Sequence, residues 1–247
     1  FTPEGRGGHV AVIDPRSNQI YFIGGSRLIP DRNPIKSSII VYNLSNKVFY
    51  LDLKSQFSTN NPPYVELPGS QMTYGSEKGT AVVGGPSKDD VYIVGGTLQN
   101  FTLLNQIENN ATITSNQTLM TNELLNTWNV TAPNIFIYRP STKSWLSPKT
   151  VANGGPTIRR RSTSTVMDQD GRIIYIFGGR EQIDTGSPTF ICFNDTALSK
   201  WNIINAANPL QQYFQMITKY SSTTQGRAGH TATLFDNNTI IIIGGTT

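Results

Sequence analysis

Few residues in this chain could carry out acid–base, nucleophilic or metal chemistry. The chain has two histidines, His9 and His230, and a single cysteine, Cys192. The histidines hold equivalent places in a repeated sequence pattern, so we expect them to have structural roles. Cys192 lies between Phe190 and Phe193, where burial is expected rather than reactivity. These residues therefore favour packing over catalysis.

Other catalytic patterns are missing from the sequence. A single cysteine excludes an internal disulfide and a zinc site with several thiolates. There is no Gly-x-Ser-x-Gly nucleophile motif, and the glycine pairs end apolar runs instead of opening a phosphate-binding helix. We therefore predict no catalytic residue, no cofactor and no metal ligand, and we expect that the chain is not an enzyme.

The charge of the chain is mildly basic, with a formal net charge of +4 and a pI of about 9.2. The only dense basic run is 159–161, three consecutive arginines. We interpret it as a solvated or repeat-packing feature, so no nucleic-acid partner is expected. No apolar run approaches the roughly 18 residues of a membrane span, so a membrane contact is expected only through regions outside this chain.

Acceptor triplets for N-linked glycans occur seven times. All fall in stretches that we expect to be exposed turns or loops, where a glycan can be carried. The acceptors are Asn43, Asn100, Asn110, Asn116, Asn129, Asn194 and Asn237. Asn and Thr are also good turn residues in any protein, but the placement favours a secreted or cell-surface glycoprotein.

A strand pattern that repeats along the chain must position the histidines, the cysteine and the glycan acceptors. Four short apolar runs each end in a glycine pair: 19–25, 90–96, 172–179 and 239–245. Glycine reaches positive φ cheaply and lets another backbone pass close by. We predict that these runs are the second strands of successive sheets, with Tyr21, Tyr92 and Tyr175 at equivalent positions.

Each run is preceded by a strand of small residues and a turn, which predicts an antiparallel hairpin. A second hairpin is expected downstream in three of the units, at 39–42 with 47–50, 135–138 with 143–145, and 190–193 with 200–203. This alignment puts Phe49 or Tyr50, Trp145 and Trp201 at a shared position. Two hairpins make a four-stranded antiparallel sheet, and repeated sheets of this kind stack around an axis.

At this point the sequence resembles the kelch family of β-propellers. The matching elements are Arg-x-x-His at 6–9 and 227–230, the glycine pairs, and the spacing of Tyr138 and Trp145. The second unit departs from the pattern with Glu77 and Thr80, and the third has Ser164 at the histidine position. The arginines that open three units, Arg6, Arg161 and Arg227, are expected to bond carbonyls or a carboxylate of a neighbouring blade.

The predicted fold class is therefore all-β, a propeller of four-stranded antiparallel kelch blades over residues 1–247. The units are about 5–52, 77–147, 158–203 and 226–247, with an insertion at 97–134. We interpret the chain as a partial propeller of three blades plus half of a fourth, with the remaining blades as partners. A complete small propeller with irregular blades is the alternative.

Connection lengths favour binding at one face. The connections between strands 2 and 3, and between strand 4 and the next strand 1, are long and leave the same face, where recognition usually occurs. We therefore predict a non-catalytic extracellular or cell-surface propeller that binds a protein or glycan. The alternative is a segment of a galactose-oxidase-like or other carbohydrate-active enzyme. Its catalytic residues would lie outside this chain, since no set here matches the Tyr, Cys and His ligands of such oxidases.

The glycan hypothesis predicts that more than one acceptor asparagine is modified in the native protein. Asn43 and Asn237 are expected first, and Asn194 last, because an Asp between acceptor and Thr lowers occupancy. The intact mass before and after endoglycosidase treatment measures this. An unchanged mass, with every acceptor recovered unmodified, would contradict the extracellular interpretation.

Overall fold

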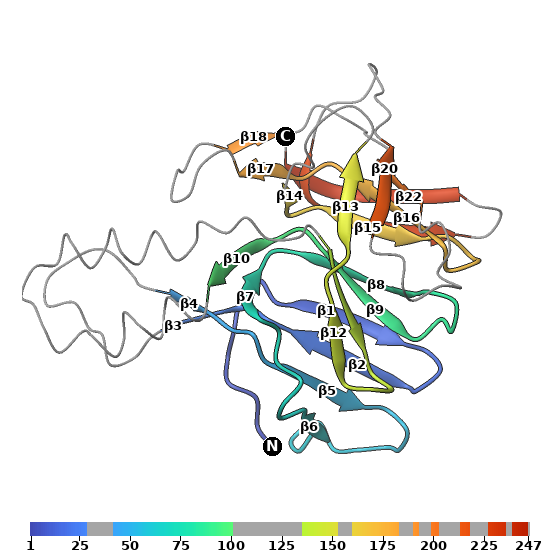
Figure 1. Ribbon diagram of the computed structural model, residues 1–247. Coiled ribbons are helices and arrows are strands. Elements are labelled where there is room, and N and C mark those ends of the chain that lie inside the picture. Colours follow the sequence, from blue (N-terminus) through green and yellow to red (C-terminus); the bar gives the residue numbers. More distant parts are fainter. Residues whose placement is uncertain are drawn as a thin grey trace, which may run out of the picture.

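The computed structural model describes residues 1–28, 42–100, 135–152, 160–182, 190–192, 199–202, 213–217, 227–235 and 239–246. All the regular elements in these ranges are β-strands, and Figure 1 shows them as sheets that follow one another along the chain. None of these ranges forms a helix with the length and hydropathy of a membrane span. Three sheets are blades with four antiparallel strands each, and a fourth is a single hairpin.

The first two blades come from the N-terminal part of the chain. Blade A has the strand order β1-β2-β5-β6, where the strands are β1 (Val10–Asp14), β2 (Gln19–Ile23), β5 (Val48–Asp52) and β6 (Tyr64–Glu66). Blade B runs from inside to outside as β8 (Thr80–Gly84), β9 (Asp90–Val94), β11 (Ile135–Arg139) and β12 (Ser144–Leu146). Consecutive apolar residues in these strands point to opposite faces of the sheet, so each blade has two faces that can be buried.

The C-terminal part forms the other two sheets. Blade C consists of β15 (Ser164–Met167), β16 (Ile173–Phe177), β19 (Ser199–Asn202) and β20 (Tyr213–Ile217). A fifth strand, β13 (Lys149–Ala152), follows blade B in sequence and pairs in parallel with β20 at the outer edge of blade C. Hairpin D consists of β21 (Ala228–Phe235) and β22 (Thr239–Thr246).

Two of the expected second hairpins are wrong, because the runs expected to form their first strands pair instead with short strands next to the glycine pairs. Only that of blade B, β11 with β12, is confirmed. In blade A the run ending at Tyr50 is the third strand, because β5 pairs with β2, and β6 is the fourth. In blade C, β19 pairs with β16 and β20 is the fourth strand. The runs expected as third strands contribute β4 (Tyr42–Leu44) and β18 (Phe190–Cys192), which pair instead with β3 (Ser26–Leu28) and β17 (Arg180–Gln182).

The reason for this error lies in the fourth strands. β6 has only three residues and follows a polar segment with two prolines, so it has no clear strand signal in the sequence. The proposed aromatic alignment is also wrong: Trp145 lies on a fourth strand, whereas Phe49 and Trp201 lie on third strands. Blade A therefore extends to Glu66 and blade C to Ile217.

The glycine-pair strands are the second strands of successive sheets, as predicted: β2, β9, β16 and β22. Tyr21, Tyr92 and Tyr175 occupy equivalent positions, since each lies opposite a valine of the first strand. Both glycines of every pair have positive φ. A Cβ on Gly24 would lie 2.5 Å from the carbonyl oxygen of Ser76, which belongs to the chain entering blade B. The glycine pairs thus permit close backbone contact between neighbouring sheets.

Two apolar clusters fill the spaces between blades. Between A and B, Tyr21 and Ile23 pack with Val91, Ile93 and Tyr138. Between B and C, a second cluster joins one face of blade B to Ile174 and Ile176. Hairpin D packs its inner strand against β15. Its other face is exposed at Phe235, Ile241 and Ile243.

Backbone hydrogen bonds link the sheets near the common axis. Gly8, Lys78 and Ser162 lie two residues before their first strands, and Gly229 is the equivalent residue within β21; all four have positive φ. The N–H of Lys78 donates to the carbonyl of Gly8 at 2.7 Å, that of Ser162 to Lys78 at 2.8 Å, and that of Gly229 to Ser162 at 2.9 Å. Since the first strands also contact one another in the order A, B, C and D, they are the innermost strands. We call this hydrogen-bonded series the axial chain.

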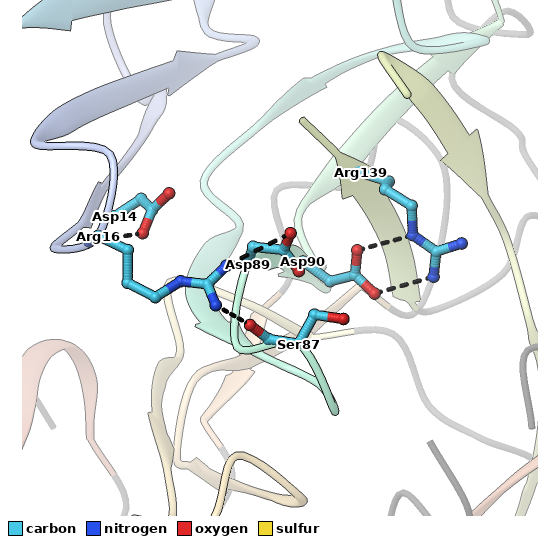
Figure 2. Close-up of polar contacts among 6 residues, drawn as sticks. All are labelled: Asp14, Arg16, Ser87, Asp89, Asp90 and Arg139. Carbon is cyan, nitrogen blue, oxygen red and sulfur yellow. Dashed lines mark hydrogen bonds and ion pairs between the residues drawn. The ribbon is translucent and has the colours of Figure 1, made fainter. Parts of the chain in front are cut away.

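The β1–β2 and β8–β9 turns make the contacts at the opposite face. Figure 2 shows Arg16 of the first turn reaching Asp89, at 3.3 Å, and the carbonyl of Ser87 in the second. Next to them, Asp90 accepts two hydrogen bonds from Arg139, both 2.9 Å, which joins the second and third strands of blade B. These side chains are therefore engaged in holding the scaffold together.

The close approach at Gly24 generates a stability prediction. Gly24→Ala would place a methyl group against Ser76, whereas Gly244, at the equivalent position with φ +75°, has nothing within 4 Å of its Cβ position. Both variants incur the cost of positive φ, but only the first adds overpacking. We expect Gly24→Ala to lose at least about 2 kcal/mol more than Gly244→Ala in denaturant unfolding. Equal losses would show that the close approach does not matter.

Candidate functional site at the axial rim

The site that we consider is a set of four residue pairs next to the axial chain, which we call the axial rim. In each repeat, the residue that directly precedes the axial-chain residue lies opposite the residue that follows the glycine pair. The pairs are Gly7 with Ser26, Glu77 with Thr97, Arg161 with Arg180, and Ala228 with Thr246. The backbone register is the same each time, but the side chains differ.

The rim lies at the face from which the long connections depart. It is formed where first strands begin and second strands end, whereas the short β1–β2, β8–β9 and β15–β16 turns lie at the other end of these strands. Most residues of the long connections lie outside the described ranges. The rim is thus the described part of the face that the sequence indicated for binding.

The register also corrects the alignment of the arginine and histidine motif. His9 and His230 are equivalent, but the third repeat has Thr163 at this place instead of Ser164, because Ser164 pairs with Phe177 one residue before the glycines. The second repeat has Gly79 there instead of Thr80. The equivalent of Arg6 and Arg227 is consequently Arg160 rather than Arg161. A one-residue shift of this kind has no signal in a single sequence.

Arg6 and Arg227 bond carbonyls, as expected, but within their own sheets. Arg6 Nη1 donates to the carbonyl of Gly24 at 3.1 Å, and Arg227 Nη1 donates to that of Gly244 at 3.3 Å. The expected contact with a neighbouring blade is therefore wrong for these two residues. Arg6 also lies over the ring of Phe49, and burial lowers its pKa. Both arginines thus support the first glycine of a pair.

The two histidines differ in burial. His9 is exposed, with its ring 5.7 Å from that of Phe22, whereas His230 is buried. A Cβ on Gly178 would lie 2.8 Å from His230 Cε1, so this ring packs on the glycine pair of blade C. Burial, and then the charge of Arg227, lower the pKa of His230 and favour its neutral form. His230 therefore packs between sheets, whereas a structural role for His9 stays a prediction.

Charged side chains gather in the middle of the rim. Glu77 is buried, and its carboxylate lies 3.6 Å from the ammonium group of the exposed Lys78. Arg180 Nη2 donates to Thr246 Oγ1 at 3.4 Å, so it reaches from blade C to hairpin D. Arg161 is half-buried, and its pKa is lowered by desolvation, raised by Glu77 and lowered by Arg180. Glu77, Arg161 and Arg180 therefore interact electrostatically with one another.

The arginines at 159–161 are visible in the sequence, but the cluster is not. Arg180 falls in a stretch that is predicted to be a long connection, and Glu77 stands out only as a departure from the arginine motif. The positions that follow each glycine pair repeat as Ser26, Thr97, Arg180 and Thr246, which is a signal that could have shown Arg180 as unusual. Within the described ranges, no group of three or more His, Cys, Asp or Glu side chains could hold a metal ion.

Two glycan acceptors lie in described residues. Asn43 belongs to strand β4, opposite Arg27, rather than to a tight turn between two strands of a blade. Asn100 ends strand β10 (Thr97–Asn100), opposite Tyr74 of strand β7 (Tyr74–Glu77), and is half-buried rather than in an exposed loop. Asn110, Asn116, Asn129, Asn194 and Asn237 lie outside the described residues. Their modification stays a prediction.

Comparison with known proteins supports the propeller fold. No protein-family model and no curated protein sequence matches the chain. The solved structure of YjhT, a kelch-type propeller protein, aligns with 97% of this chain at 17% identity and a TM-score of 0.58. The chain is a β-propeller built from four-stranded antiparallel blades. It spans 59% of the length of YjhT.

A second solved structure is a fungal alcohol oxidase of the AA5 family in complex with copper. It aligns with 74% of this chain and 30% of its own length, at 16% identity and a TM-score of 0.40. A similarity this low supports no conclusion about the propeller described here.

The environment of His230 generates a pH prediction. Its pKa in the folded state is below the ordinary value of 6.5, so the unfolded state takes up the proton more readily. Stability from this group is complete above pH 6.5 and is lost as the pH falls through that value toward the folded-state pKa. We expect NMR titration to place the pKa of His230 below 6.5, and His230→Asn to reduce the loss of stability on acidification. A pKa at or above 6.5 would contradict the burial of this ring.

Proposed function

We propose that this propeller is a non-catalytic binding protein that takes a protein or glycan ligand at the axial rim. The observation that carries the proposal is the contrast between a repeated backbone and unrepeated side chains at the four rim pairs. This contrast can be seen without knowing the identity of the ligand. The rim also belongs to the face that carries the long connections, which adds surface for recognition.

The contrast has a physical meaning. Positions needed for the fold keep one residue type or one conformation, as the glycine pairs and the positive-φ residues of the axial chain do. The rim pairs keep the same backbone bonding with Gly and Ser, Glu and Thr, two Arg, or Ala and Thr. The same backbone register therefore carries different side chains in each repeat, charged in some and uncharged in others. Side chains that differ at a repeated backbone position favour a role in binding.

The opposite face of the propeller supports the assignment of ligand binding to the rim. Its turns are short, and their polar groups bond between blades: Lys88 Nζ donates to the carbonyl of Gln169 at 3.0 Å, and the N–H of Gly85 donates to Gly171 at 2.8 Å. Arg16 reaches the next turn in the same way (Figure 2). Groups already engaged in the scaffold are less available to a ligand.

The non-catalytic part of the proposal rests on the histidines. They hold the same repeat position, and His230 packs on a glycine pair in its neutral form, where it stabilises contact between sheets. An extracellular or cell-surface location remains part of the proposal and rests on the acceptor triplets. The remaining blades are still a prediction, favoured by the exposed Ile241 and Ile243, whose equivalents Tyr21 and Ile23 are buried against blade B.

Two lysines of blade B provide a matched test. Lys78 and Lys88 are both exposed, and both have positive φ, 55° and 54°, but they lie at the rim and at the opposite face. Asn tolerates this conformation, so Lys78→Asn and Lys88→Asn make the same charge change at the same backbone cost. The probes are an array of neutral and acidic glycans together with acidic and basic peptides. We expect Lys78→Asn to lower the array signal by about tenfold, as for loss of one charged contact, and Lys88→Asn to leave it unchanged.

The outcomes separate clearly. Selective loss with Lys78→Asn supports binding at the rim. Equal effects of the two variants, or no binding by the unmodified protein to any probe, would overturn the proposal. Thermal unfolding of both variants is the control, because a change in the folded fraction would lower every signal together.

A further inference from the structure

Hairpin D is packed on one side only. Its inner strand β21 contacts β15 of blade C, whereas Phe235, Ile241 and Ile243 on its other face are exposed. Among the described residues, neither of the two apolar clusters between the blades includes a residue of this hairpin. Elements with few buried apolar contacts open at the lowest free energy in a folded protein. Hairpin D is therefore the sheet that separates most easily from its neighbour.

Backbone hydrogen bonds hold the hairpin to blade C. The N–H of Gly179 donates to the carbonyl of Arg227, and the N–H of Gly229 donates to that of Ser162, both at 2.9 Å. Each bond has only a modest net effect on stability, because water replaces it when the sheets separate. The side chain that lies between the two sheets, His230, therefore has a large influence on whether they stay together.

The ring of His230 fills this junction without a hydrogen bond. The residue is 5% exposed, and neither ring nitrogen has a hydrogen-bond partner in the part of the chain that the structure describes. Its Cε1 lies 2.8 Å from the Cβ position of Gly178, and Ser164 Oγ donates to its carbonyl. A neutral imidazole leaves one donor and one acceptor unpaired here, whereas an imidazolium would leave two donors and a positive charge unpaired. The packed junction thus disfavours the protonated ring.

The charged groups near the ring do not offset this cost. Arg227 of the same hairpin lowers the pKa of His230, and no carboxylate is among the described groups that act on it. From blade C, Arg180 reaches the hairpin and donates to Thr246 Oγ1 at 3.4 Å. Protonation therefore gains no carboxylate partner while the sheets are packed. Once they separate, water accepts the hydrogen bonds of the imidazolium.

We propose that hairpin D is a pH-sensitive element, released from blade C when His230 takes up a proton from solvent, while the junctions between blades A, B and C stay packed. This inference is independent of the proposed function, because it concerns the scaffold and not a ligand. The separated state binds the proton with the ordinary pKa of 6.5, and the packed state binds it only at lower pH. Separation therefore becomes more favourable as the pH falls below 6.5, by up to about tenfold at one pH unit below.

Amide hydrogen exchange, followed by NMR at about pH 7.5 and about pH 5.5, tests this inference after correction for the intrinsic exchange rates. The N–H groups of Gly179 and Gly229 link blade C to hairpin D, and those of Gly25 and Lys78 make the equivalent bonds between blades A and B. We expect the protection of the first two amides to fall by about tenfold at the lower pH. The protection of the other two should stay unchanged.

The two histidines provide matched variants. His230→Leu should remove the pH dependence, because leucine fills a similar space and does not titrate. His9→Leu is the control, since His9 holds the same repeat position but is exposed, so its protonation has little cost. If His230→Leu does not fold, His230→Asn replaces it, and the comparison of the two junctions in the unmodified protein still decides the inference.

Loss of protection at the junction of blade C with hairpin D supports the inference if it disappears with His230→Leu and persists with His9→Leu. Equal loss at both junctions would show that acid loosens the whole propeller, and the inference would fail. It would also fail if Gly179 and Gly229 kept their protection at the lower pH, or if the pH dependence persisted without His230.

Discussion

In blades A and C, the contact between the glycine pair and the chain that enters the next sheet is the constraint on which the packing of the propeller depends. The N–H of Gly25 donates to the carbonyl of Ser76 at 2.7 Å, and the N–H of Gly179 donates to that of Arg227 at 2.9 Å. These bonds need the neighbouring backbone to lie where a Cβ would otherwise be. The sheets can then come close enough to bury Tyr21 and Ile23 of blade A against blade B. Apolar packing supplies most of the stabilisation, but the glycines set the distance at which it occurs.

The dependence on glycine pairs explains why the second strands of the sheets could be predicted from the sequence. The four apolar runs with their glycine pairs specify the second strands, their order and the equivalent tyrosines. The third and fourth strands of blades A and C could not be placed, because β6 has only three residues and the pairing of β6 and β20 joins segments that are not adjacent in sequence. Local patterns predict a hairpin where two strands are adjacent in sequence. The third strands of blades A and C instead have their fourth-strand partners after longer connections.

The rim was harder to predict for a different reason. Its pairs depend on the register of residues on either side of a positive-φ position, and a shift of one residue changes which side chains face each other. The sequence shows three arginines in a row at 159–161, but only the register separates Arg160, the equivalent of Arg6, from Arg161, which lies opposite Arg180. The arginine at the position of Arg6 and the arginine opposite Arg180 are therefore adjacent in sequence.

The axial chain has a direction. In all three of its hydrogen bonds, the N–H of the later sheet donates to the carbonyl of the earlier one, from Lys78 to Gly8, Ser162 to Lys78, and Gly229 to Ser162. Successive bonds of the same sense polarise one another, so each junction strengthens its neighbour. The series is therefore vectorial: a sheet presents a donor to its predecessor and an acceptor to its successor. A sheet inserted back to front would bring acceptor against acceptor on one side and donor against donor on the other, so these bonds favour one orientation of the blades.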